Sequence, residues 1–156
     1  MSNKYISYNT NEVKWSYFLN FFSTNAQIRV NNNKNSEFSW NIRNLQLGTI
    51  AEISLVQMAS NNALDTTTYC IRCLNTYQDG YDSFNTTSAI LYMGMGMKTI
   101  EYPTYHKLIS ENLNSITLVI TDDIISSNGI YGGIDPAISF SVVLEVIDYV
   151  DKQNPL

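Results

Sequence analysis

The residues with the most chemical potential in this chain are Cys70 and Cys73, its two cysteines, which stand at the C-x-x-C spacing. Such a pair can form a redox couple or half of a zinc site. The pair lies in the run 69–74, where the residues alternate as they do in a β-strand. Side chains three positions apart on a strand point to opposite faces, and neither a second C-x-x-C nor enough histidines exist to complete a zinc site. We therefore predict two buried thiols that do not pair.

The single histidine, His106, is the next candidate for chemistry. A cupin-type metal site needs several histidines, and a Ser-His-Asp triad would need a nucleophile-elbow pattern, which the sequence lacks. We interpret His106 as a packing or surface residue on an edge strand. The sequence thus predicts no catalytic residue, no cofactor, no resident metal and no enzyme activity.

Three carboxylates form the remaining candidate. Asp122, Asp123 and Asp135 flank or occupy one glycine-rich loop, 122–136. Paired carboxylates and backbone carbonyls can bind Ca²⁺, but this spacing matches no EF-hand. Asp122 and Asp123 also adjoin the end of an expected strand, where carboxylates are common because they are solvated. Whether these residues bind calcium stays open at this point.

Size and charge exclude several classes of protein. The 156 residues suit one domain, and the net charge is -5, with 9 basic residues against 14 acidic ones. The basic residues are scattered, so we expect neither direct nucleic-acid binding nor attraction to an anionic membrane. No secretion signal and no apolar run long enough to span a bilayer are visible, which predicts a reducing compartment and no membrane insertion.

The elements that must position these residues are strands. Every second residue from Ile138 to Val146 is apolar, and the stretch 115–121 repeats this pattern. Between Ile42 and Leu45 the apolar phase slips, which predicts a bulge or corner. The expected strands are 26–30, 38–43, 51–57, 68–74, 89–93, a Pro-containing edge segment at 99–109, 115–121 and 138–150.

These strands predict an all-β fold, a single eight-stranded antiparallel jelly-roll β-sandwich with an N-terminal arm. An immunoglobulin-like sandwich is the other architecture with such strands, but it wants cysteines far apart on facing sheets. The expected division is an arm at 1–24, the jelly-roll domain at 25–150 and a C-terminal tail at 151–156.

The expected arm is dense in aromatic residues and has no sustained period of two. It either packs on its own domain or docks on a neighbouring subunit. We predict that removal of residues 1–24 leaves a folded domain that assembles less well. Aromatic side chains are enriched in interface cores. The predicted assembly interface consists of Trp15, Tyr17, Phe18, Phe21 and Phe22.

The order of segments resembles the single jelly-roll penton and minor capsid proteins of nucleocytoplasmic large DNA viruses and their virophages. The stretches that carry the likeness are 38–42, 51–55, 69–74, 116–122 and 133–140, within residues 25 to 150. The resemblance implies a non-enzymatic viral structural protein at a fivefold vertex or between major capsid proteins. It also implies a homo-oligomer, a pentamer in the penton case, made in the host cytoplasm and located in the virion.

Two other functions fit a jelly roll of this composition. The first is a carbohydrate- or receptor-binding module, because Tyr and Trp side chains can serve as stacking platforms for sugars. The second is a trimeric ligand of the tumour-necrosis type, against which the missing secretion signal counts. Oligomeric state distinguishes them: a pentamer indicates a penton, a trimer the ligand, and a stable monomer counts against a capsid subunit.

Overall fold

The computed structural model describes residues 12–31, 33–48, 50–61, 68–77, 88–95, 98–109, 112–122 and 133–150. Within them the regular elements are strands and one 3-10 helical turn, and none of the described helical segments has the length and hydropathy of a membrane-spanning helix. The elements are β1 (Val13–Phe22), η1 (Ser23–Asn25), β2 (Gln27–Asn31), β3 (Lys34–Gln46), β4 (Ala51–Ser60), β5 (Thr68–Cys73), β6 (Ala89–Met95), β7 (His106–Lys107), β8 (Asn112–Asp122) and β9 (Phe140–Tyr149).

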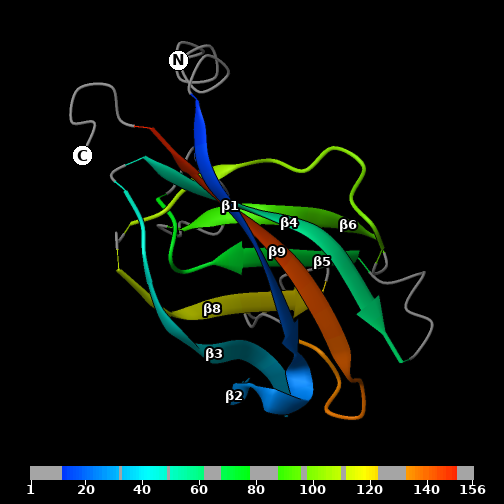
Figure 1. Ribbon diagram of the computed structural model, residues 1–156. Helices are drawn as coiled ribbons and strands as arrows, with labels where there is room; N and C mark the ends of the chain where they lie inside the picture. Colours follow the sequence, from blue (N-terminus) through cyan, green and yellow to red (C-terminus); the bar gives the residue numbers. More distant parts are fainter. Residues whose placement is uncertain are drawn as a thin grey trace.

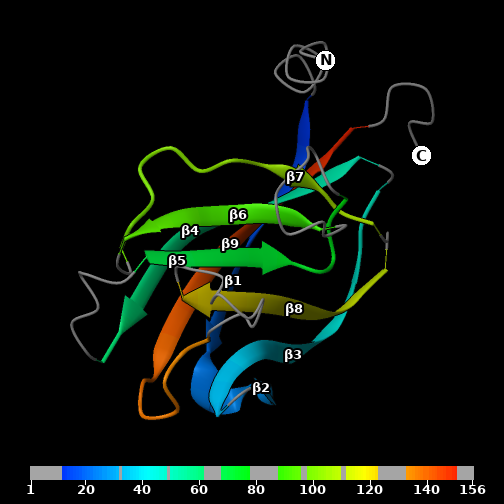
Figure 2. The ribbon, with the colours of Figure 1, turned by 180° about the vertical axis from the view of Figure 1, so that it is seen from behind.

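The strands form two antiparallel sheets that pack face to face as a β-sandwich. The first sheet has the order β1-β9-β4-β7, and the second has the order β2-β3-β8-β5-β6. Figure 1 shows β1, β9 and β4 of the first sheet in front of the second, and Figure 2 shows β6, β5, β8 and β3 from the other side. If β2 is left out, the other eight strands can be renumbered 1 to 8 in chain order. The first sheet then has the order 1-8-3-6 and the second sheet the order 2-7-4-5, which is the strand order of a jelly roll. The predicted fold class is therefore confirmed.

Apolar side chains from the inner faces of both sheets fill the core. In β9 the buried and half-buried residues alternate through all ten positions, so the predicted inward face is confirmed. An aromatic cluster lies where β3 approaches β9 and β1: Phe38 meets Phe140 edge-on at 4.7 Å, and Trp40 stacks on Phe21 at 5.0 Å. The fully buried side chains around this cluster include Ile53, Leu55, Ile71, Ile116, Leu118, Ile120, Leu144 and Val146.

The predicted phase slip in β3 is a register irregularity. Against β8, the pairing shifts between Asn41 and Leu45. The shift lets Trp40 and Leu45 both approach the core although they differ in parity along the strand. The hairpin between β2 and β3 turns through Asn33, whose positive φ of 64° is one that asparagine tolerates well.

The N-terminal segment differs from the prediction. Its described part, from Val13 to Phe22, is a ten-residue strand that pairs with β9 from Val13↔Tyr149 to Phe22↔Ser141, so it is an edge strand of the sandwich and not an arm. The described strands consequently number nine. The predicted eight counted β2 but missed β1. Residues 1–11 and the predicted tail 151–156 lie outside the described residues.

Candidate functional site

The two cysteines occupy opposite faces of β5. Cys73 belongs to the core between the sheets with Tyr69 and Ile71, whereas Cys70 is buried on the other face, and neither thiol forms a disulfide bond. Burial raises the pKa of the Cys73 thiol to about 12, against the opposing effect of a hydrogen bond from Asn75. Because the thiolate is the reactive form, Cys73 is poorly suited to redox or nucleophilic chemistry at neutral pH. The prediction that the two thiols are buried and do not pair with each other is confirmed.

His106 lies on the edge strand that the sequence predicts. Its strand, β7, ends the first sheet and pairs with β4 through Ile53↔His106 and Glu52↔Lys107. The His106 ring is half-buried, and its Nε2 atom lies 3.0 Å from the Thr104 hydroxyl. Both contacts fit a packing role at the margin of the sheet.

The three aspartates do not form a described cluster. Asp135 is exposed, and its carboxylate accepts the backbone N–H of Ala137 at 2.9 Å, as a turn residue does. Asp122 is the last residue of β8, and its side chain and all of Asp123 fall outside the described residues. Across the part of the chain that the structure describes, no group of three or more His, Cys, Asp or Glu side chains is placed to hold a metal ion.

The predicted interface residues divide into two that contact the core and three that are exposed. Trp15 lies on the same face of β1 as Tyr17 and Phe21, because it pairs with Asp148 on the inward face of β9, but it stands near the start of the strand. Tyr17 and Phe21 pack against the core, so these two are structural. Trp15, Phe18 and Phe22 are instead 57%, 61% and 55% exposed. Among the described strands, β1 pairs with β9 alone, so these exposed rings lie along an edge of the first sheet. The structure therefore keeps three of the five predicted residues as candidates for contact with another molecule.

A cluster of acids and tyrosines covers the outer face of the first sheet. The Tyr105 hydroxyl donates to Glu145 Oε1 at 2.6 Å, and Ser16 donates to Glu145 Oε2 at 3.2 Å. Glu145 belongs to β9 and Tyr105 precedes β7, so the Tyr105 side chain crosses over the intervening strand β4. Below this crossing, Glu52 and Ser54 of β4 are buried even though they face away from the core.

This cluster attaches the segment 100–106, which we call the arch, to the first sheet. At the start of the arch, Ile100 donates its backbone N–H to Val56 of β4 at 2.9 Å, and at its end His106 pairs with Ile53 of the same strand. Tyr105 anchors the arch between these points. Because the tyrosine hydroxyls donate to carboxylates, the cluster is built to hold the arch in place.

Alkaline pH should loosen this cluster. Burial, together with the neighbouring Glu52 carboxylate, raises the pKa of Tyr149. The folded state then holds this proton more tightly than the unfolded chain, in which tyrosine titrates near pH 10. The stabilisation is therefore present in full below about pH 10 and is lost as the pH rises further. We expect Tyr149→Phe to be less stable than the parent at pH 7 and the difference to narrow above pH 10, as measured by urea unfolding.

Tyr102→Phe is the matched control, because the Tyr102 side chain is 83% exposed. This variant should follow the parent in stability at both pH values. A gap between parent and Tyr149→Phe that stays constant from neutral to alkaline pH would show that the Tyr149 proton is not bound more tightly in the folded state.

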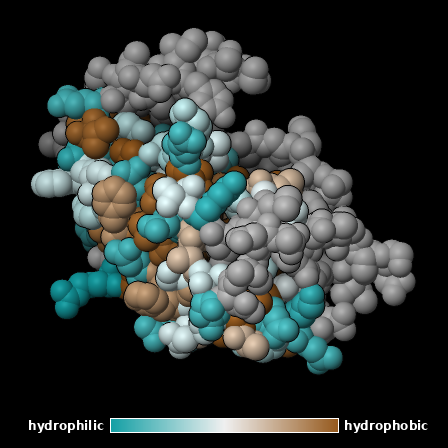
Figure 3. All heavy atoms as spheres, turned by 90° about the vertical axis from the view of Figure 1, so that its right-hand side faces the viewer, coloured by the Kyte–Doolittle hydropathy of each residue, from teal (hydrophilic) through white to brown (hydrophobic). Residues whose placement is uncertain are grey.

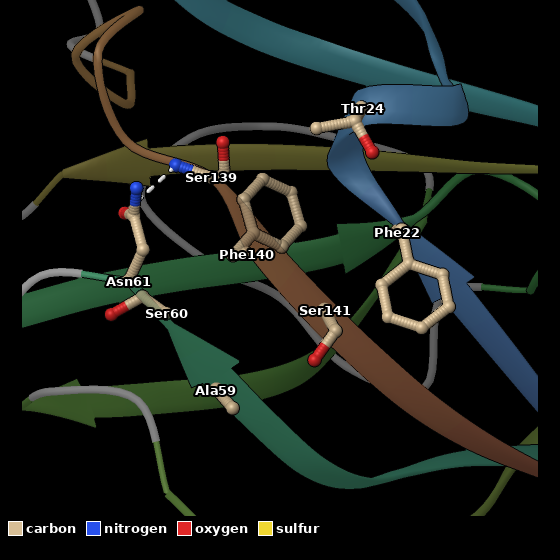
Figure 4. Close-up of a pocket in the computed structure, with 8 residues that line it drawn as sticks. All are labelled: Phe22, Thr24, Ala59, Ser60, Asn61, Ser139, Phe140 and Ser141. Carbon is tan, nitrogen blue, oxygen red and sulfur yellow. Dashed lines mark hydrogen bonds between the residues drawn. The ribbon is translucent and has the colours of Figure 1, made fainter.

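A pocket lies at the end of the first sheet, where β1 and β4 end and β9 begins. Its volume is about 220 Å³. Figure 4 shows the Phe22 ring on one side, Ser60 and Asn61 on the opposite side, and Ser139, Phe140 and Ser141 between them. All eight residues that line the pocket are uncharged. One exposed aromatic ring beside several hydroxyls and an amide can bind a small neutral polar ligand.

The frame of the pocket is held by hydrogen bonds. The Phe140 N–H donates to the Ser23 hydroxyl at 2.9 Å, which joins β9 to the turn after β1. Asn61 donates its own N–H to the Ser139 carbonyl at 2.9 Å, and its side-chain oxygen accepts the Ser139 N–H at 3.1 Å. With that oxygen engaged, the Asn61 amide presents its NH₂ group as a donor.

Sequence reasoning missed both the pocket and the acid–tyrosine cluster. Phe22 and Ser141 are neighbours only through the β1–β9 register, and Tyr105 meets Glu145 only across β4. One local signal was available: Glu145 is a charged residue between Val143 and Ile147 on the outward face of β9. The side view of Figure 3 shows why surface hydropathy adds little, since hydrophobic and hydrophilic side chains lie intermixed over the coloured part of that face.

Comparison with known proteins finds several similar solved structures. No protein-family profile and no curated protein matches the chain. The mavirus penton protein is 13% identical with a TM-score of 0.39, over 54% of this chain and 34% of the penton chain. The xylan-binding module CBM86 from Roseburia intestinalis is 7% identical with a TM-score of 0.37, over 85% of this chain and 96% of the module.

A family two carbohydrate esterase from Cellvibrio japonicus is 9% identical with a TM-score of 0.24, over 85% of this chain and 34% of the esterase. This chain spans about a third of the length of the mavirus penton chain. All three TM-scores lie below 0.5, so these likenesses carry no argument about function. The strand order of the two sheets is what identifies the chain as a jelly-roll β-sandwich.

Proposed function

We propose that this protein is a non-enzymatic structural subunit that assembles with copies of itself, as a penton or minor capsid protein of a DNA virus. Its partners in this proposal are identical subunits, in a pentamer at a fivefold vertex, and the major capsid protein. Its location is the virion. Neither nucleic acid nor a membrane is a direct partner.

The observation that carries the proposal is the exposed apolar edge of the first sheet. Val13, Trp15, Phe18 and Phe22 are each more than half exposed, and all four lie on β1. An open strand edge with large apolar side chains invites pairing with another chain, and soluble monomers usually blunt such edges. Here a single cation, Lys14, lies within the strand. A strand edge of this kind is suited to contact with a neighbouring subunit.

In a closed ring of identical subunits, the β1 edge would form one side of each subunit interface. Identical subunits in a ring meet through two different surfaces, so the β1 edge would contact a different face of the next subunit. Trp and Phe are typical anchors of such contacts because they bury much apolar area. The proposal therefore makes Trp15 and Phe18 anchor residues of the ring interface.

Oligomeric state tests the proposal. We expect mass photometry and sedimentation velocity to show a pentamer for the parent chain and mostly monomer for the double variant Trp15→Ser and Phe18→Ser. Each anchor should contribute at least about 2 kcal/mol to the interface if it is a hot spot. Both replaced side chains are more than half exposed, so the thermal midpoint of the monomer should change little.

Lys14→Ser is the control on the same strand, since it removes an exposed polar side chain and keeps both rings. It should leave the pentamer intact. A parent chain that stays monomeric at high concentration would overturn the proposal, and a trimer would favour a ligand of the tumour-necrosis type.

A further inference from the structure

We propose that the pocket between Phe22, Asn61 and Ser141 is a binding site for one neutral pyranose ring, such as the end of a glycan. The site goes beyond the structural role proposed above. It is assigned from the chemistry of its walls, and it does not require that the protein form a capsid.

The first argument is the aromatic wall. Phe22 is the last residue of β1 and is 55% exposed, and its ring borders the pocket (Figure 4). Its backbone is fixed, because the Phe22 carbonyl accepts the Trp40 indole N–H at 2.8 Å and Phe22 pairs with Ser141. A rigidly held, exposed ring can stack on the C–H face of a pyranose and loses little entropy when it does so.

Polar groups line the rest of the pocket, which is the second argument. Ser139 and Ser141 contribute hydroxyls that both donate and accept, and Thr24 adds a third at the rim. The Asn61 amide is oriented by its bond to the Ser139 N–H, so its NH₂ group serves as a donor of defined direction. A sugar presents alternating donors and acceptors on its edge, and this combination of groups can match them.

The third argument is size and charge. The volume of about 220 Å³ is smaller than the roughly 300–1,000 Å³ of sites for drug-sized molecules, so it suits a single ring. Because none of the described residues that line the pocket is charged, an anionic sugar would be desolvated against them without a counter-charge. A neutral sugar ring loses less hydration free energy when it enters the pocket. For an open site with one stacking ring, we expect a dissociation constant on the order of 1 mM.

The experiment uses the full chain and a panel of probes: D-glucose, D-galactose, D-mannose, D-xylose, N-acetylglucosamine and, as the anionic sugar, N-acetylneuraminic acid. Saturation-transfer NMR should show contact with at least one neutral sugar and none with the anionic one. Phe22→Ala should weaken that signal at least about tenfold, the size expected for loss of a main anchor. Asn61→Ala should weaken it less.

Tyr102→Ala is the control, because Tyr102 is an exposed ring that neither lines the pocket nor belongs to the proposed ring interface. It should bind sugar as the parent does. The proposal is overturned if no neutral sugar binds at tens of millimolar, if Phe22→Ala binds normally, or if the anionic sugar binds best.

Self-association is the competing use of this pocket, and the test separates the two. The Trp15→Ser and Phe18→Ser double variant retains every pocket residue, so it should still bind sugar whatever its oligomeric state. If Phe22→Ala changes the oligomeric state while no sugar binds to the parent, the pocket holds a neighbouring subunit and the sugar assignment is wrong.

Discussion

Phe140→Ala is expected to lower the free energy of unfolding by about 3–5 kcal/mol, the cost of emptying a buried phenylalanine site. The Phe140 side chain is 4% exposed and lies between the sheets, edge-on to Phe38 with an interplanar angle of 81°. Because Phe38 also stacks near Trp40 at 6.2 Å, loss of the Phe140 ring leaves a void next to the largest side chains of the core. Urea unfolding followed by tryptophan fluorescence measures the change.

Ser141→Ala, one position further along β9, is the control. Its side chain faces outward and is half-buried, so the free energy of unfolding should change by less than about 0.5 kcal/mol. Since Phe140 also borders the pocket, Leu144→Ala serves as a second core variant far from it, with an expected loss of about 2–5 kcal/mol. Losses below about 1 kcal/mol for both core variants would mean that the inner faces are not packed as described.

The same alternation explains how much of the fold the sequence predicts. In β9 the inward residues Phe140, Val142, Leu144 and Val146 are apolar, whereas Ser141 and Glu145 stand among the outward ones, so the period of two is visible without any structure. The slip after Ile42 is visible for the same reason, because the apolar residues change parity. Strands with one buried face and one solvent-facing face can be predicted from their sequence pattern, and β3, β8 and β9 are of this kind.

The strand β1 was hidden because both of its faces are apolar. Tyr17, Leu19 and Phe21 face the core, while Phe18 and Phe22 face outward and stay exposed. Apolar residues on both faces erase the period of two, and the remaining spacing imitates a helical stripe. The apolar residues on the outer face thus prevented prediction of the strand. The same residues make this face a candidate for docking and, at Phe22, for ligand binding.

The two side-chain clusters lay beyond prediction for a different reason. Each combines residues from strands that are distant in sequence, and their meeting depends on register: Ser54 pairs with Glu145, and Ala59 pairs with Ser141. A shift of one residue in either pairing would send these side chains to the other face. The apolar pattern fixes the face of each residue but not which strands pair or an offset of two residues, so neither the Tyr105–Glu145 contact nor the pocket could be inferred.

Deletion of residues 1–24 is expected to prevent stable folding, in contrast to the folded but weakly assembling domain that an arm would leave behind. The deletion removes the inward side chains of β1 and the partner strand along one whole side of β9. It also removes the Phe21 ring stacked on Trp40 and the carbonyl that accepts the Trp40 indole N–H. Loss of Phe21 alone should cost about 3–5 kcal/mol, and a whole domain is stable by only about 5–15 kcal/mol.

Circular dichroism and ¹⁵N-¹H correlation spectra of the truncated chain decide between the two interpretations. Collapsed amide dispersion is expected for the truncated chain, while the double variant Trp15→Ser and Phe18→Ser, which keeps the strand and its inward residues, should give a dispersed spectrum. A truncated chain with the parent's thermal midpoint would mean that β1 is a dispensable arm after all. The comparison has force because both proteins lose the exposed aromatic surface of Trp15 and Phe18, and only one loses the inward face that closes the core.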